Sequence, residues 1–131
     1  MYKNGQAIVI LRGNLTRDPE MKYTPNGAAR TTGSVAINKT YKDKTGAMKE
    51  SVSFIPWTAW GPTAERIAEF CRKGQEVSIV GELRQERYET DGKSNAFIHV
   101  VVERFDFGDK PKGGDAVPEE PAEFNEEEAP F

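Results

Sequence analysis

The sequence predicts an all-β fold with one helix, closed as a small Greek-key barrel. Short apolar runs rich in β-branched residues recur between turn signals along most of the chain. Only one segment, between the third and fourth runs, repeats its apolar residues at helical spacing. Two segments, Thr24-Pro25-Asn26-Gly27 and Thr90-Asp91-Gly92-Lys93, carry the turn chemistry that connects neighbouring strands.

Three predicted strands come first. Ala7–Gly13 is a β-branched apolar run, and Asp18-Pro19 follows it as a turn signal. Ala29–Asn38 is the second strand, and Ser51–Trp60 is the third. Between them, the polar stretch Lys39–Glu50 predicts a long loop.

The single helix follows the third strand. Pro62 suits its first position, because the N–H that proline lacks is unpaired there anyway. Arg72 and Lys73 suit the last turn and Gly74 the residue beyond it. The apolar residues at helical spacing are Ala64, Ile67, Ala68 and Cys71.

Two further strands, Val77–Tyr88 and Phe97–Phe107, complete the predicted barrel. Five short strands with one helix between the third and the fourth are typical of the five-stranded OB-fold. The sequence therefore predicts an OB-fold domain over residues 1–107.

Charge and composition change near Gly108. Residues 1–107 hold 16 Lys and Arg against 13 Asp and Glu, whereas residues 108–131 hold 2 against 8. The second segment consists mainly of Gly, Pro, Asp and Glu, with little apolar surface to bury. We expect a mildly basic folded domain followed by a disordered acidic tail.

Several protein classes are excluded by composition. No apolar run approaches the ~18 residues of a membrane span, and the N-terminus has no signal-peptide pattern. The single cysteine, Cys71, cannot form an internal disulfide, so we expect an intracellular protein. We find no catalytic triad, phosphate-binding glycine loop or metal cluster, and His99 lies mid-strand as a structural residue. An enzyme is disfavoured, and no cofactor or metal is expected.

The third strand indicates a binding surface. Alternation places Ile55, Trp57 and Ala59 on one face, and leaves Phe54 and Trp60 on the other. Aromatic side chains interleaved with cations suit single-stranded nucleic acid, since rings stack on bases and cations neutralise phosphates. The alternative is that these rings pack against another subunit or complete the core.

From Ile10 to about Phe107 the chain resembles the bacterial-type single-stranded DNA-binding proteins, of bacterial or phage origin. These are OB-fold replication factors. The order and spacing of several short motifs carry the resemblance: Gly13-Asn14-Leu15, Asp18-Pro19-Glu20, Tyr23-Thr24-Pro25-Asn26-Gly27, the segment from Asp43 to Glu50, Arg72-Lys73-Gly74 and Val80-Gly81-Glu82-Leu83.

The resemblance implies the residues of a DNA site. Trp57 has no stacking counterpart and is expected in the core, whereas Tyr23 either stacks or braces its turn. The base-stacking positions are Tyr41, Phe54, Trp60 and Tyr88. The implied phosphate contacts are Arg17, Lys22, Lys39, Lys42, Lys44, Lys49, Arg72, Lys73, Arg84, Arg87 and Lys93.

The end of the chain extends the resemblance. Family members finish with a disordered linker and an acidic tip that closes in Pro-Phe. Such a tip can place a ring in an apolar pocket and its carboxylate on a basic group of a partner protein. The corresponding residues here are Glu126, Glu127, Glu128, Ala129, Pro130 and Phe131.

The function implied is sequence-independent binding of single-stranded DNA in the cytoplasm, associated with the nucleoid. It protects replication, recombination and repair intermediates and recruits replication and repair proteins through the tip. The resemblance also implies a homotetramer, with a dimer as the alternative. An OB-fold RNA-binding or translation module would need the same aromatic face but has no reason for the Pro-Phe tip.

Overall fold

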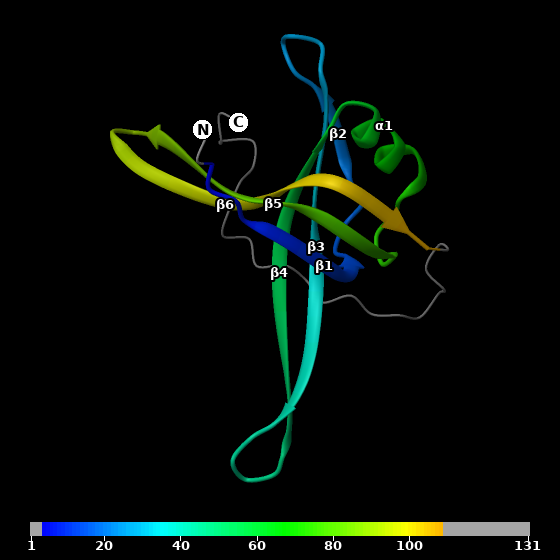
Figure 1. The fold of residues 1–131 in the computed structure, drawn as a ribbon, viewed down its shortest axis with the longest axis vertical. Coiled ribbons are helices and arrows are strands. Elements are labelled where there is room, and N and C mark those ends of the chain that lie inside the picture. Colours follow the sequence, from blue (N-terminus) through cyan, green and yellow to red (C-terminus); the bar gives the residue numbers. More distant parts are fainter. Residues whose placement is uncertain (1–3, 109–131) are drawn as a thin grey trace.

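The computed structural model describes residues 4–108, which form a closed β-barrel with one helix packed against it (Figure 1). The strand order in the sheet is β1-β5-β6-β4-β3-β2, and an additional pairing of β1 with β3 closes it. The elements are β1 (Ile8–Leu15), β2 (Glu20–Tyr23), β3 (Ala29–Lys42), β4 (Met48–Trp60), α1 (Gly61–Phe70), β5 (Glu76–Thr90) and β6 (Lys93–Phe107). The predicted OB-fold, with its helix between the third and fourth barrel strands, is confirmed.

Two short pairings complete the circle of strands. The end of β1 pairs with β3 through Asn14↔Ala36 and Leu15↔Val35. The only parallel pair among the described strands joins β4 to β6, through Trp57↔Val100 and Thr58↔Val101. The other barrel contacts are long antiparallel ladders, so closure depends on these two seams.

The core lies on the face of β4 that alternation predicts. Trp57 is 1% exposed, and its ring centroid lies 5.3 Å from that of Phe105 on β6. Ala59 is fully buried, whereas Trp60 is 43% exposed. Gly33 on β3 lies directly opposite Trp57, and a Cβ atom there would overlap the indole ring. The inward orientation of Trp57 is thereby confirmed.

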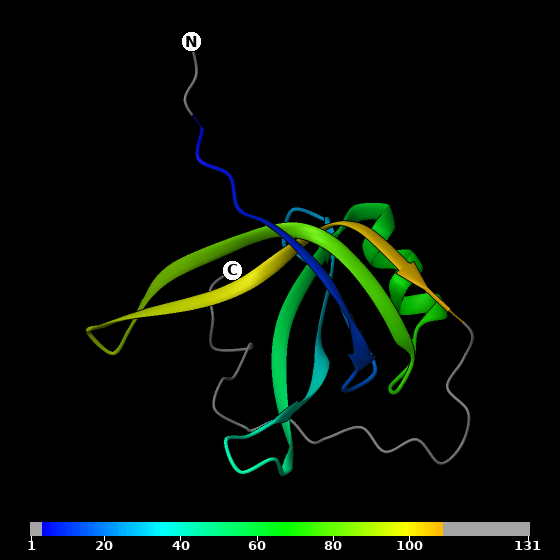
Figure 2. The same ribbon diagram turned by 60° about the horizontal axis from the view of Figure 1, so that its bottom comes forward.

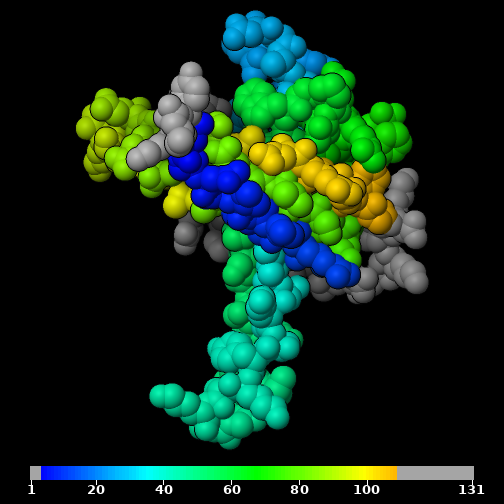
Figure 3. Space-filling model, viewed as in Figure 1, coloured from blue at the N-terminus to red at the C-terminus, as the bar shows by residue number. Residues whose placement is uncertain are grey.

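Two hairpins project from the barrel as arms (Figures 1 and 3). In the first, β3 and β4 stay paired out to Lys42↔Met48, so most of the segment predicted as a loop, Lys39–Glu50, is a two-stranded ladder. In the second, β5 and β6 pair out to Thr90↔Lys93 around a two-residue turn. Asp91 and Gly92 both have positive φ there, as this tight turn requires.

The structure adds a short strand that the sequence did not predict. Glu20–Tyr23 pairs with the start of β3 as β2, through Lys22↔Arg30 and its neighbours. The hairpin-type turn predicted at Asn26-Gly27 is confirmed, since it joins these two strands. Gly27 has φ +82° and donates its backbone N–H to the carbonyl of Thr24 at 2.8 Å.

Helix α1 begins and packs as predicted but ends earlier. Pro62 lies in its first turn, and Ala64 and Ile67 are buried against the barrel. The helix stops at Phe70, so Arg72 and Lys73 lie beyond its last turn. Arg72 nevertheless donates from Nη1 to the carbonyl oxygens of Ala68 and Cys71, at 3.1 and 2.7 Å. A cation thus reaches the carboxyl end of the helix by folding back onto it.

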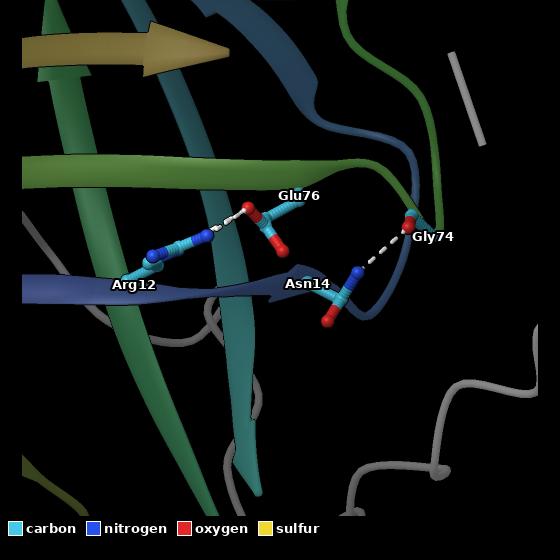
Figure 4. A network of polar contacts seen from close by, with 4 residues as sticks. All are labelled: Arg12, Asn14, Gly74 and Glu76. Atoms are coloured by element: carbon cyan, nitrogen blue, oxygen red, sulfur yellow. Dashed lines mark hydrogen bonds and ion pairs between the residues drawn. The ribbon is translucent and has the colours of Figure 1, made fainter. Parts of the chain in front are cut away.

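The connection between α1 and β5 is fixed to β1. Asn14 donates from Nδ2 to the carbonyl oxygen of Gly74 at 3.0 Å, and Arg12 forms an exposed ion pair with Glu76 at 3.0 Å (Figure 4). Gly74 in turn donates its N–H to the carbonyl of Leu15 at 2.8 Å. These contacts position the start of β5 alongside β1 (Figure 2).

Within residues 4–108, no helix is long and apolar enough to cross a membrane. The predicted disordered tail and its tip lie at residues 109–131, outside the described residues.

Candidate nucleic-acid interface

We define the outer face as the side of β2, β3, β4, β5 and β6 that carries Trp60 and faces away from the core. Cross-strand register assigns its members, because residues directly opposite in an antiparallel pair point to the same side. Trp60 lies opposite Arg30, and Phe54 lies opposite Ala36. On the second arm, Tyr88 lies opposite Asn95 on the side that also carries His99.

Three of the four predicted stacking residues lie on the outer face. Trp60 is exposed, and Phe54 and Tyr88 are half-buried. Phe97 on β6, which sequence reasoning did not single out, adds another ring, with its centroid 5.2 Å from that of His99. Half-buried rings have restricted rotamers, so stacking a base on them costs little conformational entropy.

Tyr41, the fourth predicted stacking residue, lies on the opposite side of the first arm. Tyr41 pairs with Lys49 of β4. Because Lys49 and Phe54 are an odd number of residues apart on that strand, their side chains, and with them Tyr41 and Phe54, point to opposite sides. Tyr41 is 51% exposed because the arm extends beyond the barrel and has no core on either side. A single nucleic-acid strand whose bases stack on both Tyr41 and Phe54 must therefore pass around the edge of this arm.

The predicted phosphate contacts form several groups. Lys22, Lys42 and Arg84 lie on the outer face, and Lys93 lies at the end of the second arm. Lys39 and Lys49 flank Tyr41 on the other side of the first arm, with Lys44 in its turn. The remaining predicted contacts lie elsewhere: Arg17 between β1 and β2, Arg72 and Lys73 after α1, and Arg87 on the side of the second arm away from Tyr88.

The turn of the first arm is held by Asp43. Its Oδ1 accepts hydrogen bonds from the hydroxyl and N–H of Thr45, at 2.6 and 2.9 Å, and from the N–H of Ala47 at 3.0 Å. The hydroxyl bond of Thr45, aided by the backbone bonds, lowers the pKa of Asp43. A charged carboxylate thus orders a turn whose other charges are the exposed ammonium groups of Lys42 and Lys44.

His99 is buried in the outer face. Its Nδ1 lies 2.9 Å from the hydroxyl of Thr58, and its Nε2 lies 3.5 Å from a carboxylate oxygen of Glu86. Burial lowers the pKa of His99, and Arg30 and Arg84 add to that effect, whereas Glu86 opposes it. The imidazole is therefore neutral at pH 7 and joins β4, β5 and β6 by hydrogen bonding.

One cation of the outer face was missed by sequence reasoning. Arg30 lies between Lys22 of β2 and Trp60 of β4, directly opposite each of them. It stands alone among small residues in the sequence, so only the strand register shows which side chains it lies between. The register itself depends on the turns at both ends of β3.

The described residues contain no group of three or more His, Cys, Asp or Glu that could hold a metal ion. Cys71 is buried in the core, and burial raises the pKa of its thiol to about 11. A protonated, buried thiol is a poor nucleophile, so Cys71 is a packing residue.

The closed barrel defines this chain as an OB-fold protein, and sequence comparison gives the family. The model of the single-strand binding protein family matches residues 7–108, and the chain belongs to that family.

The relatives agree on this assignment. The chain is 34% identical over 102 residues to the single-stranded DNA-binding protein of Fusobacterium nucleatum, covering 78% of this chain and 66% of that one. It is 36% identical over 107 residues to single-stranded DNA-binding protein A of Bacillus subtilis, covering 81% and 61%. The match thus spans less than two-thirds of each relative's length.

A solved structure shows the same fold. It is the structure of the SSB of Plasmodium falciparum in complex with single-stranded DNA, and this chain superposes on it with a TM-score of 0.76. At 20% identity, the superposition covers 83% of this chain and all of the other.

Proposed function

We propose that this chain binds single-stranded DNA with little sequence preference and protects intermediates of replication, recombination and repair in the cytoplasm. The outer face is the observation that carries the proposal. It combines Trp60, Phe54 and Tyr88 with the cations of Lys22 and Arg84 on one continuous sheet. Stacking and phosphate contacts use features that all nucleotides share, so they favour unpaired strands without reading their sequence.

Titration with oligo(dT), oligo(U) and duplex DNA tests this function. We expect Trp60 fluorescence to be quenched most strongly by oligo(dT), because this exposed ring is placed to stack on bases. Affinity should fall with salt, with a log–log slope of roughly −0.7 for each phosphate neutralised. Equal affinity for duplex DNA at moderate salt would contradict the proposal, and tighter binding of oligo(U) would favour the RNA-binding alternative.

The proposal includes recruitment of replication and repair enzymes through the tip at residues 126–131. Acidic residues steer the encounter with a basic partner, and the terminal ring with its carboxylate suits an apolar pocket with a basic rim. This part of the proposal rests on the sequence and the family resemblance. We propose a binding protein that acts through contacts, without catalysis.

Phe131→Ala separates the two activities. It keeps every charged side chain and removes only the terminal ring, so we expect unchanged affinity for oligo(dT) and loss of partner capture from a bacterial lysate. Deleting residues 122–131 removes Glu123 and the three glutamates 126–128 as well. It should additionally strengthen DNA binding at low salt, since those acids compete with DNA for the cations. If the Phe131→Ala variant still captures partner proteins, the terminal ring does not recognise them and the tip acts only through its charge.

We also propose a homotetramer, with a dimer as the alternative. Strand β1 lies uncovered on the surface (Figure 3), where Ile10 is 77% and Ile8 61% exposed. On the second arm, Leu83 and Ile98 are exposed as well. Exposed apolar side chains on β1 and along the second arm suit contacts between copies of the chain. Light scattering gives the mass directly, and Ile10→Asp should lower it.

A further inference from the structure

Arg30 lies at the centre of a row of three side chains across the outer face. The register places Lys22 of β2 directly opposite it on one side and Trp60 of β4 directly opposite it on the other. Side chains in such positions have Cβ atoms about 4.5–5.5 Å apart. Two cations and an exposed indole are therefore neighbours.

Arg30 differs from three other arginines of the barrel strands in lacking an ion-pair partner. Arg12, Arg84 and Arg104 form ion pairs with Glu76, Glu82 and Asp106, at 3.0, 3.5 and 2.9 Å. Among residues 4–108, the structure records no ion pair or hydrogen bond of Arg30. Its Nε is buried and has no hydrogen-bond acceptor. Since Nε is shielded, the terminal nitrogens of this half-buried side chain are those that can meet an anion.

The surrounding charges do not neutralise Arg30. Lys22 is a like charge directly opposite, and like charges in that arrangement destabilise a sheet. Arg84 is another cation near His99, and the nearby carboxylate of Glu86 lies against His99. Glu20, two register pairs along β2, lies opposite Thr32 and forms no recorded ion pair with Arg30. Burying part of a guanidinium among other cations costs desolvation free energy unless an anion binds to it and neutralises its charge.

We propose that Arg30 binds a backbone phosphate of the nucleotide whose base stacks on Trp60. This inference rests on the proposed function, since it assigns one contact within the same single-strand site. A guanidinium presents its terminal donors as a planar fork that fits two phosphate oxygens, and half-burial of the stem holds the fork in place beforehand. Lys22, directly opposite Arg30 on β2, adds a second positive charge beside the same phosphate.

Arg30→Met tests the assignment, with Arg104→Met as the matched control. Binding of a short oligo(dT) is measured over a range of salt concentrations. We expect Arg30→Met to reduce the log–log salt slope by ~0.7 for each arginine engaged, which corresponds to about fivefold weaker binding at about 0.1 M salt and little difference near 1 M. Arg104 is exposed and paired with Asp106, so its replacement should leave slope and affinity unchanged.

Thermal unfolding separates a binding role from a structural one. Removing a half-buried cation that has no partner should leave the Tm of Arg30→Met unchanged or raise it. Arg30→Lys should retain the wild-type salt slope, because it keeps the charge while losing the fork. Losses on oligo(dA) should match those on oligo(dT), since a phosphate is common to both.

Three results would overturn the assignment: an unchanged salt slope, a loss confined to one base, or a lowered Tm with unaltered binding. The wild-type protein in the same titrations keeps this test apart from that of the proposed function. If the wild-type chain fails to bind oligo(dT), the proposed function itself is wrong. If it binds and Arg30→Met binds equally, only the role of Arg30 is wrong.

Discussion

Replacing Trp57 with alanine should lower the free energy of unfolding by about 3–5 kcal/mol, the usual cost of truncating a large aromatic residue in a core. The ring fills the centre of the barrel, packs on Phe105 and covers the backbone of Gly33. Neighbours cannot close the resulting cavity, because β3 is held against β4 by a long ladder and Trp57 itself forms one of the two register pairs with β6.

Chemical denaturation of Trp57→Ala followed by circular dichroism measures this loss. Trp57→Phe is the conservative control, since it retains most of the packing and should recover much of the stability. The indole Nε1 of Trp57 is buried and has no hydrogen-bond partner among the described residues, so replacement by phenylalanine breaks no hydrogen bond recorded there. A stable Trp57→Ala variant would contradict the core assignment.

Trp60→Ala should have the opposite profile, with weaker binding and a nearly intact fold. We expect single-strand affinity to fall by about 1–3 kcal/mol, the range typical of base stacking in OB-folds that bind single strands. Because Trp60 is 43% exposed at the last position of β4, its removal opens no cavity in the core.

Fluorescence anisotropy of labelled oligo(dT) gives the affinity, and a melting curve gives the stability of the same Trp60→Ala sample. Trp60→Tyr should restore most of the binding, since it returns a flat ring to the site. If Trp60→Ala unfolds the protein, or leaves the affinity unchanged, this ring does not stack on bases.

The face assignments within β4 could be predicted because alternation is a local property of a strand. Once Ile55, Trp57 and Ala59 are taken as core, Phe54 and Trp60 must lie on the other side. The barrel itself follows from the spacing of apolar runs and turn signals, which are also local. These predictions required no knowledge of which strands pair.

What the sequence did not show depends on pairing between one segment and another. Glu20–Tyr23 carries no apolar run, and it forms a strand because β3 offers its backbone a partner. The polar Lys39–Glu50 segment becomes a ladder for the same reason. Helix α1 ends at Phe70 although the apolar spacing continues to Cys71, because Cys71 has extended backbone angles.

The same distinction between local patterns and strand pairing applies to the residues of the candidate site. The family resemblance implied Trp60, Phe54 and Tyr88 as stacking residues, and the structure places them on one face. Register alone reveals that Arg30 lies between Lys22 and Trp60, and pairing of the first arm puts Tyr41 on its other side. No pattern within a single strand contains that information, because it is set by the turn that aligns two strands.

The two short seams of the barrel have a consequence for how the chain folds. The β3–β4 and β5–β6 ladders join segments that are adjacent in sequence, so each can form with a small loss of loop entropy. The β4–β6 seam joins Trp57 and Val100 across the whole of α1 and β5, and it has only two register pairs. We therefore expect both hairpins to form before the barrel closes, with closure as the slow step, since non-local pairing limits folding rates. Until that step, the apolar sides of both hairpins stay open to water, and the chain is most prone to aggregate in that interval.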